Sequence, residues 1–199
     1  MNCQFPIFKS HLDLAHRYWE QLLSDGGWAI DATCGNGKDT CKLAHILSPF
    51  YAHSGILALD IQPQAIAATQ AEVQAQFPAE NPLPIHYFCQ SHADFPPLAA
   101  QQPIRLIVYN LGYLPKGNKE ITTLTSSTLE SLLRAMQLVI PGGAISITCY
   151  PGHSEGAREQ EALLLALEQI PPQDWNICYH RFPNRKESPT LLLLQKAKN

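Results

Sequence analysis

The sequence predicts an α/β fold, in which helices cover both faces of a doubly wound and mainly parallel sheet. Short apolar stretches alternate with amphipathic ones along most of the 199 residues, the order expected of repeated strand–helix units. The run Ile104–Tyr109 is apolar and rich in β-branched residues, which is typical of a strand buried on both faces. The apolar stretch that ends at Asp31 continues into a glycine-rich turn and a helix, as in sheets that bind ligands at their edge.

The first half of the chain is expected to hold three strands that alternate with helices. Apolar residues recur at helical spacing from His11 to Leu23, and this helix ends near Asp25-Gly26-Gly27. The helix after the first strand stops before Pro49, and Pro63 lies in the first turn of the next helix, where a residue without an amide hydrogen is favoured. The predicted strands are Trp28–Asp31, Gly55–Asp60 and about Ile85–Cys89, and the third helix is Gln62–Phe77.

The second half continues the alternation. A Ser/Thr-rich entry at Thr122–Thr128 leads into a helix that runs through Leu138, and Pro141-Gly142-Gly143 turns the chain into the next strand. The other predicted elements are strands at Ile104–Tyr109, Ala144–Tyr150, Trp175–Phe182 and Thr190–Gln195, and a helix at about Glu155–Gln169. Because there is no repeat, low-complexity tract or linker, we expect a single domain over residues 1–199, with residues 1–27 as an N-terminal helical segment.

The composition excludes several classes of protein. Hydrophobic residues make up 45% of the chain and charged residues 16%, the balance of an ordinary globular protein rather than a disordered or fibrous one. The net charge of −3 gives no general attraction to nucleic acid, so any RNA-binding surface has to be local. No apolar run approaches the roughly 20 residues of a membrane span. Six cysteines without a CxxC pair indicate reduced thiols in a cytoplasmic protein, and no metal site is expected.

The turn Cys34-Gly-Asn-Gly-Lys38 and the acids around it predict the cofactor. Gly35 and Gly37 carry no side chains, so a ligand can lie against the backbone there. Asp31 at the strand end would repel a phosphate and attract an ammonium or a sulfonium, and Asp60 closes the next strand, where a carboxylate can hold a ribose diol. This pairing predicts S-adenosyl-L-methionine. The turn matches neither the G-x-G-x-x-G of dinucleotide sites nor the glycine spacing of a nucleotide triphosphatase.

We expect cofactor contacts from this turn, from both acids and from the ends of the third and fourth strands. In the loop after the third strand, His92 and Asp94 are candidates for contacting the adenine, and the alternative is that they are solvated loop residues. The full set of cofactor-binding candidates is Asp31, Thr33, Gly35, Asn36, Gly37, Asp39, Thr40, Asp60, Gln62, His92, Asp94 and Asn110.

The fourth strand ends in Asn110-Leu-Gly-Tyr-Leu-Pro115, which resembles the Asn-Pro-Pro-Tyr element of methyltransferases that act on amino nitrogens. The side-chain oxygen of Asn110 can accept hydrogens from an amine while the lone pair of that amine faces the methyl group. The ring of Tyr113 can stack on the substrate base. A polar strand end with a buried tyrosine is the alternative interpretation.

Three segments carry a more specific resemblance. They are Asp31–Thr40 (DATCGNGKDT), Asn110–Lys119 (NLGYLPKGNK) and the stretch that begins at Tyr150 (YPGHSEGAREQE). They are similar to the YtqB-like rRNA methylases, a small bacterial family associated with methylation of 5-(aminomethyl)-2-thiouridine in tRNA, and the resemblance covers about Phe5 to Leu194. It implies a class I methyltransferase fold, which is Rossmann-like, with a seven-stranded sheet whose last strand is antiparallel.

The resemblance also implies the reaction and its substrate. The activity would be transfer of a methyl group from S-adenosyl-L-methionine to the exocyclic amine of the wobble uridine, in the anticodon region of tRNA, with S-adenosyl-L-homocysteine as product. A homodimer is implied as well. By motif, the substrate side would be lined by Asn110, Tyr113, Lys116, Lys119 and His153.

The predicted catalytic residues are Asn110, Tyr113 and His153. The amine has to lose a proton before it attacks, and His153 or water is the candidate acceptor, whereas a loop histidine satisfied by the backbone is the alternative. An alternative hypothesis is that Cys149, in the pair Thr148-Cys149, is a nucleophile, since some RNA methyltransferases attack C6 of cytosine with a cysteine. Such enzymes usually carry Pro-Cys in the loop after the fourth strand, which here reads Asn-Leu-Gly-Tyr.

For RNA contact, the segment Tyr179–Lys186 interleaves aromatic and cationic residues, a mixture that suits phosphates and unstacked bases. The predicted substrate-binding cations are Lys116, Lys119, Arg181, Arg185 and Lys186. Two other functions stay open at this point. In the first, the protein methylates rRNA or a small molecule. In the second, it is a cofactor-binding subunit without catalysis that assembles through its N-terminal helix.

Overall fold

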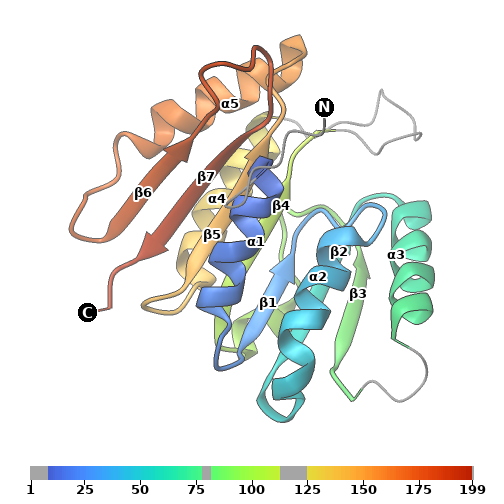
Figure 1. The fold of residues 1–199 in the computed structure, drawn as a ribbon. Coiled ribbons are helices and arrows are strands. Elements are labelled where there is room, and N and C mark those ends of the chain that lie inside the picture. Colours follow the sequence, from blue (N-terminus) through green and yellow to red (C-terminus); the bar gives the residue numbers. More distant parts are fainter. Residues whose placement is uncertain (1–8, 78–81, 113–124, 199) are drawn as a thin grey trace.

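The computed structural model describes residues 9–77, 82–112 and 125–198, which contain a seven-stranded sheet (Figure 1). The strands are β1 (Trp28–Asp31), β2 (Gly55–Asp60), β3 (Ile85–Cys89), β4 (Ile104–Asn110), β5 (Ala144–Cys149), β6 (Trp175–His180) and β7 (Thr190–Lys196). Their order across the sheet is β3-β2-β1-β4-β5-β7-β6. Strand β7 is antiparallel to both of its neighbours, and the other paired strands are parallel. The predicted mainly parallel sheet with an antiparallel last strand is confirmed.

Helices cover both faces of this sheet. They are α1 (His11–Leu22), α2 (Lys38–Leu47), α3 (Pro63–Gln76), α4 (Thr125–Leu138) and α5 (Ser154–Leu167). Trp19 of α1 and Leu43 of α2 are buried in one core with Ala29, whereas Leu132 of α4 is buried in a second core with Ile30. Ala29 and Ile30 are successive residues of β1, and successive side chains of a strand point to opposite faces. The doubly wound arrangement follows from this alternation.

The boundaries differ from the predicted ones by a few residues at several ends. Strand β4 continues to Asn110, β5 ends at Cys149 and β6 ends at His180. Two short 3-10 helices, Ser48–His53 and Pro97–Gln101, were not predicted. Each has a proline in its first turn, where the missing amide hydrogen leaves no bond unmade.

The sheet order creates a switch point between β1 and β4. The chain builds β1, β2 and β3 outward in one direction and then returns to place β4 on the other side of β1. Ligands of open α/β sheets bind beyond the carboxyl ends of the strands at such a point. The candidate site therefore lies where Asp31 and Asn110 end their strands. Within the described ranges, every helix is too short or too polar to cross a bilayer.

Candidate active site

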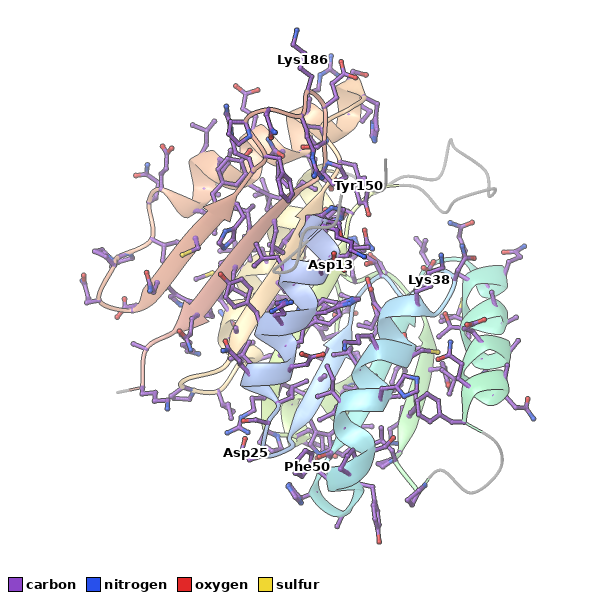
Figure 2. The ribbon with its side chains drawn as sticks, viewed as in Figure 1. Asp13, Asp25, Lys38, Phe50, Tyr150 and Lys186 are labelled. Carbon is purple, nitrogen blue, oxygen red and sulfur yellow. The ribbon has the colours of Figure 1, made fainter. Side chains whose placement is uncertain are left out.

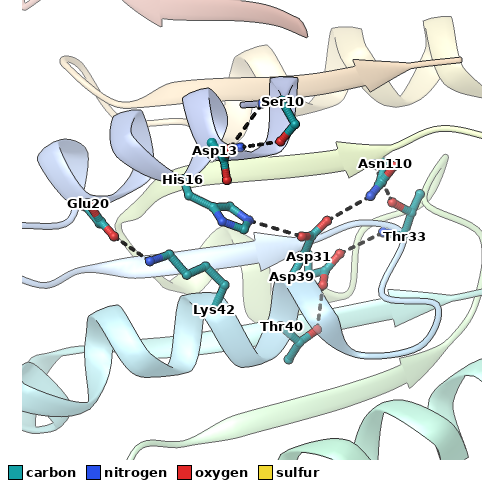
Figure 3. Close-up of polar contacts among 10 residues, drawn as sticks. All are labelled: Ser10, Asp13, His16, Glu20, Asp31, Thr33, Asp39, Thr40, Lys42 and Asn110. Carbon is teal, nitrogen blue, oxygen red and sulfur yellow. Dashed lines mark hydrogen bonds and ion pairs between the residues drawn. The ribbon is translucent and has the colours of Figure 1, made fainter. Parts of the chain in front are cut away.

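Asp31, the last residue of β1, is buried at the carboxyl edge of the sheet with 1% of its surface exposed. One carboxylate oxygen accepts a hydrogen bond from the Thr33 amide at 3.3 Å, and the other accepts one from the Thr40 hydroxyl at 2.6 Å (Figure 3). Burial, followed by the charge of nearby Asp39, raises the pKa of Asp31 to about 7. Because both of these donors are neutral, a positively charged ligand would stabilise the ionised carboxylate.

The glycine-rich turn that follows Asp31 presents bare backbone. Gly35 and Gly37 both have positive φ angles, +52° and +79°, a conformation that favours glycine. A Cβ atom on Gly37 would lie 2.9 Å from the Cα atom of Thr69 in α3, so a side chain has no room there. The Thr69 hydroxyl donates to the Gly35 carbonyl at 3.1 Å and holds the turn against α3. Asn36 is exposed at the tip of the turn.

Asp60, the last residue of β2, is bound to the same turn. One of its oxygens accepts from the Gly35 amide at 3.0 Å and the other accepts from the Gln62 amide at 2.9 Å. Burial raises the pKa of Asp60. Each carboxylate oxygen has a further lone pair, so the fixed carboxylate can also accept hydrogen bonds from a ribose diol. Gln62 takes part in this arrangement through its backbone.

Asn110 ends β4 and connects the turn to helix α2. Its backbone N–H donates to the Thr33 hydroxyl at 2.7 Å, and its side-chain Nδ2 donates to Asp39 Oδ2 at 3.1 Å (Figure 3). An ionised carboxylate only accepts hydrogen bonds, so the side-chain nitrogen of Asn110 has to face Asp39. The side-chain oxygen of Asn110 therefore points away from Asp39 and can accept from a substrate.

Helix α1 also contributes to this edge, which the sequence interpretation missed. Nε2 of His16 lies 3.6 Å from Oδ1 of Asp39, and the ring of His11 packs edge-on against Tyr150 with 5.9 Å between ring centroids. Burial raises the pKa of Tyr150 to about 12, and a hydrogen bond with the Asn110 side chain opposes that rise. The sequence signal that could have predicted this contribution is the pair His11 and His16 on the amphipathic helix α1.

Comparison with known proteins identifies the family. Residues 56–196 match the family model described as "Putative rRNA methylase". The chain belongs to this family. A relative from Arabidopsis thaliana, "tRNA (mnm(5)s(2)U34)-methyltransferase, chloroplastic", is 34% identical over an alignment of 194 residues that covers 96% of this chain and 71% of the relative.

Two solved structures of similar proteins agree with this assignment. A "putative rRNA-methylase" from Clostridium thermocellum is 28% identical with a TM-score of 0.84, over 95% of this chain and 98% of that one. A "putative methyltransferase" from Streptococcus mutans, crystallised in complex with SAH, is 26% identical with a TM-score of 0.78, over 95% of this chain and 99% of that one. The protein is an S-adenosylmethionine-dependent methyltransferase, and the predicted fold and cofactor are confirmed.

The edge of the sheet fits this cofactor on its own geometry. The turn is formed by glycines with positive φ, so no side chain projects from Gly35, and Asp31 is a buried carboxylate whose two hydrogen-bond donors, Thr33 and Thr40, are neutral. An amino acid ammonium or a sulfonium would supply the missing positive charge. Asp60 is held by two backbone amides, and its remaining lone pairs can accept from a ribose. Which of these residues touches the cofactor stays a prediction.

The loop after β3 holds His92 and Asp94, the candidates for adenine contact. The His92 ring packs edge-on against Tyr109, with 5.9 Å between centroids, and its Nδ1 is buried without a hydrogen-bond partner in the described part of the chain. Burial lowers the pKa of His92 to about 4, so the ring is neutral at physiological pH. Asp94 is exposed and binds Arg134 of α4 at 2.6 Å. Adenine contact by either residue stays a prediction.

His153 and Cys149 have environments that argue against chemical roles. Nδ1 of His153 accepts the Gly156 amide at 3.1 Å and caps helix α5, which is the backbone contact that the alternative interpretation expected. Gly156 is required there, because a Cβ atom would lie 2.1 Å from the Tyr150 carbonyl oxygen. Cys149 is 1% exposed, and burial raises the pKa of its thiol to about 12. A protonated and covered thiol is a poor nucleophile.

The cationic segment between β6 and β7 lies at the same end of the molecule as the candidate site. Figure 2 shows Lys186 at this end with Tyr150 and Lys38, and Asp25 at the opposite end. Arg181, Arg185 and Lys186 are exposed. The Arg185 guanidinium lies 4.5 Å from the centre of the Phe182 ring and donates to the Lys9 carbonyl at 2.9 Å. Tyr113, Lys116 and Lys119 lie outside the described residues, as does the rest of the segment 113–124. Across the ranges that the structure describes, no three His, Cys, Asp or Glu side chains form a group that could hold a metal ion.

Proposed function

We propose that this protein methylates the amine of 5-aminomethyl-2-thiouridine at the wobble position of tRNA. The observation that carries the proposal is the orientation of Asn110, whose side-chain nitrogen donates to Asp39 so that its oxygen faces away from that carboxylate. The oxygen has two lone pairs, so it can accept from a substrate even beside Tyr150, which is hydrogen-bonded to the same side chain. An oriented acceptor beside a methyl donor suits an amine, which has hydrogens to donate and a lone pair that attacks. The name of the Arabidopsis thaliana relative supports the choice of nucleoside and of tRNA.

The cofactor supplies a methyl carbon that its sulfonium makes electrophilic, and the protein aligns the two partners for an in-line displacement. Asp31, Asp60 and the backbone of the turn orient the nucleoside at the ends of β1 and β2. The oxygen of Asn110 accepts a hydrogen bond from an N–H of the neutral amine. This contact directs the lone pair of the amine nitrogen toward the methyl carbon. Water is the better candidate for taking the proton that the amine loses first, because the Nδ1 lone pair of His153 is used in capping α5.

The RNA would approach from the β6–β7 side of the site. Arg181 and Lys186 are exposed there without a role in the sheet, and Arg185 stacks on Phe182. This mixture of cations and an aromatic ring suits the phosphates and unstacked bases of an anticodon loop. We expect Arg181→Ala with Lys186→Ala to reduce the slope of log Kd against log salt by roughly 0.7 to 1 for each lost charge. Lys198→Ala, at the opposite end, is the matched control and should leave the slope unchanged.

We further propose that one domain carries out this reaction in the cytoplasm as a homodimer. The unbroken alternation of strands and helices supports the single domain, the cysteines without a CxxC pair support the cytoplasm, and the family resemblance supports the homodimer. Light scattering of the purified protein measures the dimer, and limited proteolysis checks that a single domain is released. Fractionation of the source cells locates the protein.

The deciding experiment offers the purified protein methyl-labelled cofactor and bulk tRNA from cells that lack its gene. Mass spectrometry of the digested tRNA should find the methyl group on the aminomethyl nitrogen of the wobble uridine. Label in rRNA or in free nucleosides with none in tRNA would overturn the proposal. Cofactor binding without any methylated product would instead favour a non-catalytic subunit.

Asn110→Ala tests the residue on which the proposal rests. This variant should bind S-adenosylhomocysteine like the wild type, because Asp31, Asp60 and the turn are intact. Its turnover should fall by about a hundredfold, the scale of losing one oriented contact at the reacting atoms. Unchanged turnover with the cofactor still bound would remove Asn110 from the reaction.

A further inference from the structure

Helix α1 lies beside the site, and the reaction described above makes no use of it. Its side chains Ala15 and Trp19 are buried in the core against the sheet. At its start, the Ser10 hydroxyl and the Asp13 carboxylate each accept a hydrogen bond from the backbone amide of the other residue, forming a capping box. The helix is thus anchored at both its first turn and its buried face, so a side chain on it holds a defined position.

His16 lies on this helix between Ala15 and Trp19 and faces Asp39 of α2. Its Nε2 is 3.6 Å from Asp39 Oδ1, and its ring centroid is 4.8 Å from that of the Trp19 indole. The side chain of Asp39 is 12% exposed, so solvent does little to orient its carboxylate. The same Nε2 has no hydrogen-bond partner within the described ranges. The Asp39 carboxylate is therefore the polar group that faces the His16 ring.

The two oxygens of Asp39 have different partners. Oδ1 faces His16, and Oδ2 accepts from Asn110 Nδ2 at 3.1 Å, so the carboxylate connects α1 with the end of β4 (Figure 3). The terminal torsion of an asparagine side chain is broad and roughly two-fold. An amide that rotated by half a turn would present its nitrogen, a donor, to an amine that also donates. Keeping Asp39 in place is thus a condition for keeping the Asn110 oxygen on the substrate side.

We propose that His16 is a positioning residue that orients Asn110 through Asp39 and so makes α1 a working part of the active site. The proposal rests on the function of Asn110 in holding the amine. His16 acts on an equilibrium between two orientations of the Asn110 amide and does not touch substrate. Its loss should lower kcat and leave the binding of the cofactor unchanged.

Substitutions of His16 and of Asp39 test this proposal. His16→Leu keeps an apolar contact with Trp19 and removes the polar one, and His16→Gln restores a donor. We expect His16→Leu to lower kcat about tenfold, with the KM for cofactor and the Kd for S-adenosylhomocysteine within twofold of wild type, and His16→Gln to recover most of the loss. Asp39→Asn, which can turn the Asn110 amide, should lower kcat by about a hundredfold. His45→Leu on α2 is the matched control.

The double variant separates positioning from packing. If His16 acts through Asp39, adding His16→Leu to Asp39→Asn lowers kcat no further. Independent losses that multiply, a His16→Leu kcat within twofold of wild type, or a His16→Gln variant worse than His16→Leu would each overturn the proposal. The last outcome is the one expected of a residue that only packs against Trp19.

A readout without substrate keeps this test separate from the proposed function. In ligand-free protein labelled with ¹⁵N-asparagine, the side-chain amide signals of Asn110 are identified by their absence in Asn110→Ala. His16→Leu and Asp39→Asn should both shift or broaden these signals, and His45→Leu should not. Unmoved signals in His16→Leu would overturn the positioning role whatever the substrate is. A wild type that fails to methylate tRNA, with the signals behaving as expected, would overturn only the proposed function.

Discussion

Asp31→Asn should make the ligand-free protein more stable and the cofactor bind more weakly. Burial, with the charge of Asp39 second, raises the pKa of Asp31 from its ordinary value of 3.8 to about 7. The amide fits the same hydrogen bonds, because its oxygen can accept from the Thr33 amide and its nitrogen can donate to the Thr40 hydroxyl. The substitution therefore removes a buried charge and preserves the local contacts.

The pH dependence gives this prediction its sign. Below pH 3.8 the carboxyl group is protonated in the folded and unfolded states, so it costs nothing. Between pH 3.8 and about 7 the unfolded chain ionises and the folded protein does not, so wild-type stability falls as pH rises. One pKa unit is worth about 1.36 kcal/mol, so the cost of Asp31 is about 2 kcal/mol at pH 5 and about 4 kcal/mol at pH 8. Asp31→Asn should gain up to those amounts.

Urea unfolding of the ligand-free wild type and Asp31→Asn at pH 5 and pH 8 measures the difference. Asp174→Asn, an exposed carboxylate outside the site, is the control and should change stability little at either pH. A variant that is no more stable than wild type at pH 8, or equally shifted at both pH values, would refute the reasoning.

Calorimetry with two ligands then asks which cation Asp31 serves. S-adenosylmethionine carries an ammonium and a sulfonium, and S-adenosylhomocysteine keeps only the ammonium. Equal losses of affinity in Asp31→Asn would assign the carboxylate to the ammonium, and a larger loss for S-adenosylmethionine would assign it to the sulfonium. Unchanged affinity for both would contradict the binding role.

Three further outcomes are expected. The pKa of His92 is lowered to about 4 by burial, so the unfolded chain binds the extra proton and wild-type stability falls by up to about 3 kcal/mol between pH 6.5 and 4; urea unfolding should show that His92→Gln lacks this loss. Gly37→Ala meets Thr69 at 2.9 Å with a φ of +79°, so it should cost about 1–2 kcal/mol or more in thermal unfolding and weaken S-adenosylhomocysteine binding. Cys149→Ser should keep its turnover, and denaturing gels of the wild type should show no protein–RNA adduct.

The cofactor half of the site could be predicted because its determinants are local in sequence. A strand, an acid and a glycine turn follow one another from Trp28 to Gly37, and in a parallel sheet the carboxyl ends of strands meet at one edge. That rule was enough to bring Asp31, Asp60 and Asn110 together from three separate strands. For Gly37 the predicted reason was the approach of a ligand, whereas the structure shows that a Cβ atom there would meet Thr69 of α3 at 2.9 Å.

The contacts that orient Asn110 could not be predicted, because they depend on packing across the fold. Its backbone amide binds Thr33 from 77 residues away, and Asp39 is fixed by a helix whose rotation about its axis is set by the core. The amphipathic pattern of α1 predicts which side of that helix is buried. It does not predict the angle at which α1 crosses the sheet, and that angle decides whether His16 reaches Asp39.

The order of the strands also separates two kinds of charge along one edge. The half-buried Asp60 ends β2, the buried Asp31 ends β1, Asn110 ends β4, and the exposed cations follow β6 at the far side of the sheet. A cationic amino acid ligand is attracted to the first region and RNA phosphates to the last, and each region repels the ligand of the other. The amide lies between them with no charge of its own, at the point where a methyl donor on one side can meet a nucleoside on the other. Reversing the charge of the acids that end β1 and β2, or of the cations that follow β6, should therefore affect ligand binding more than the chemistry at Asn110.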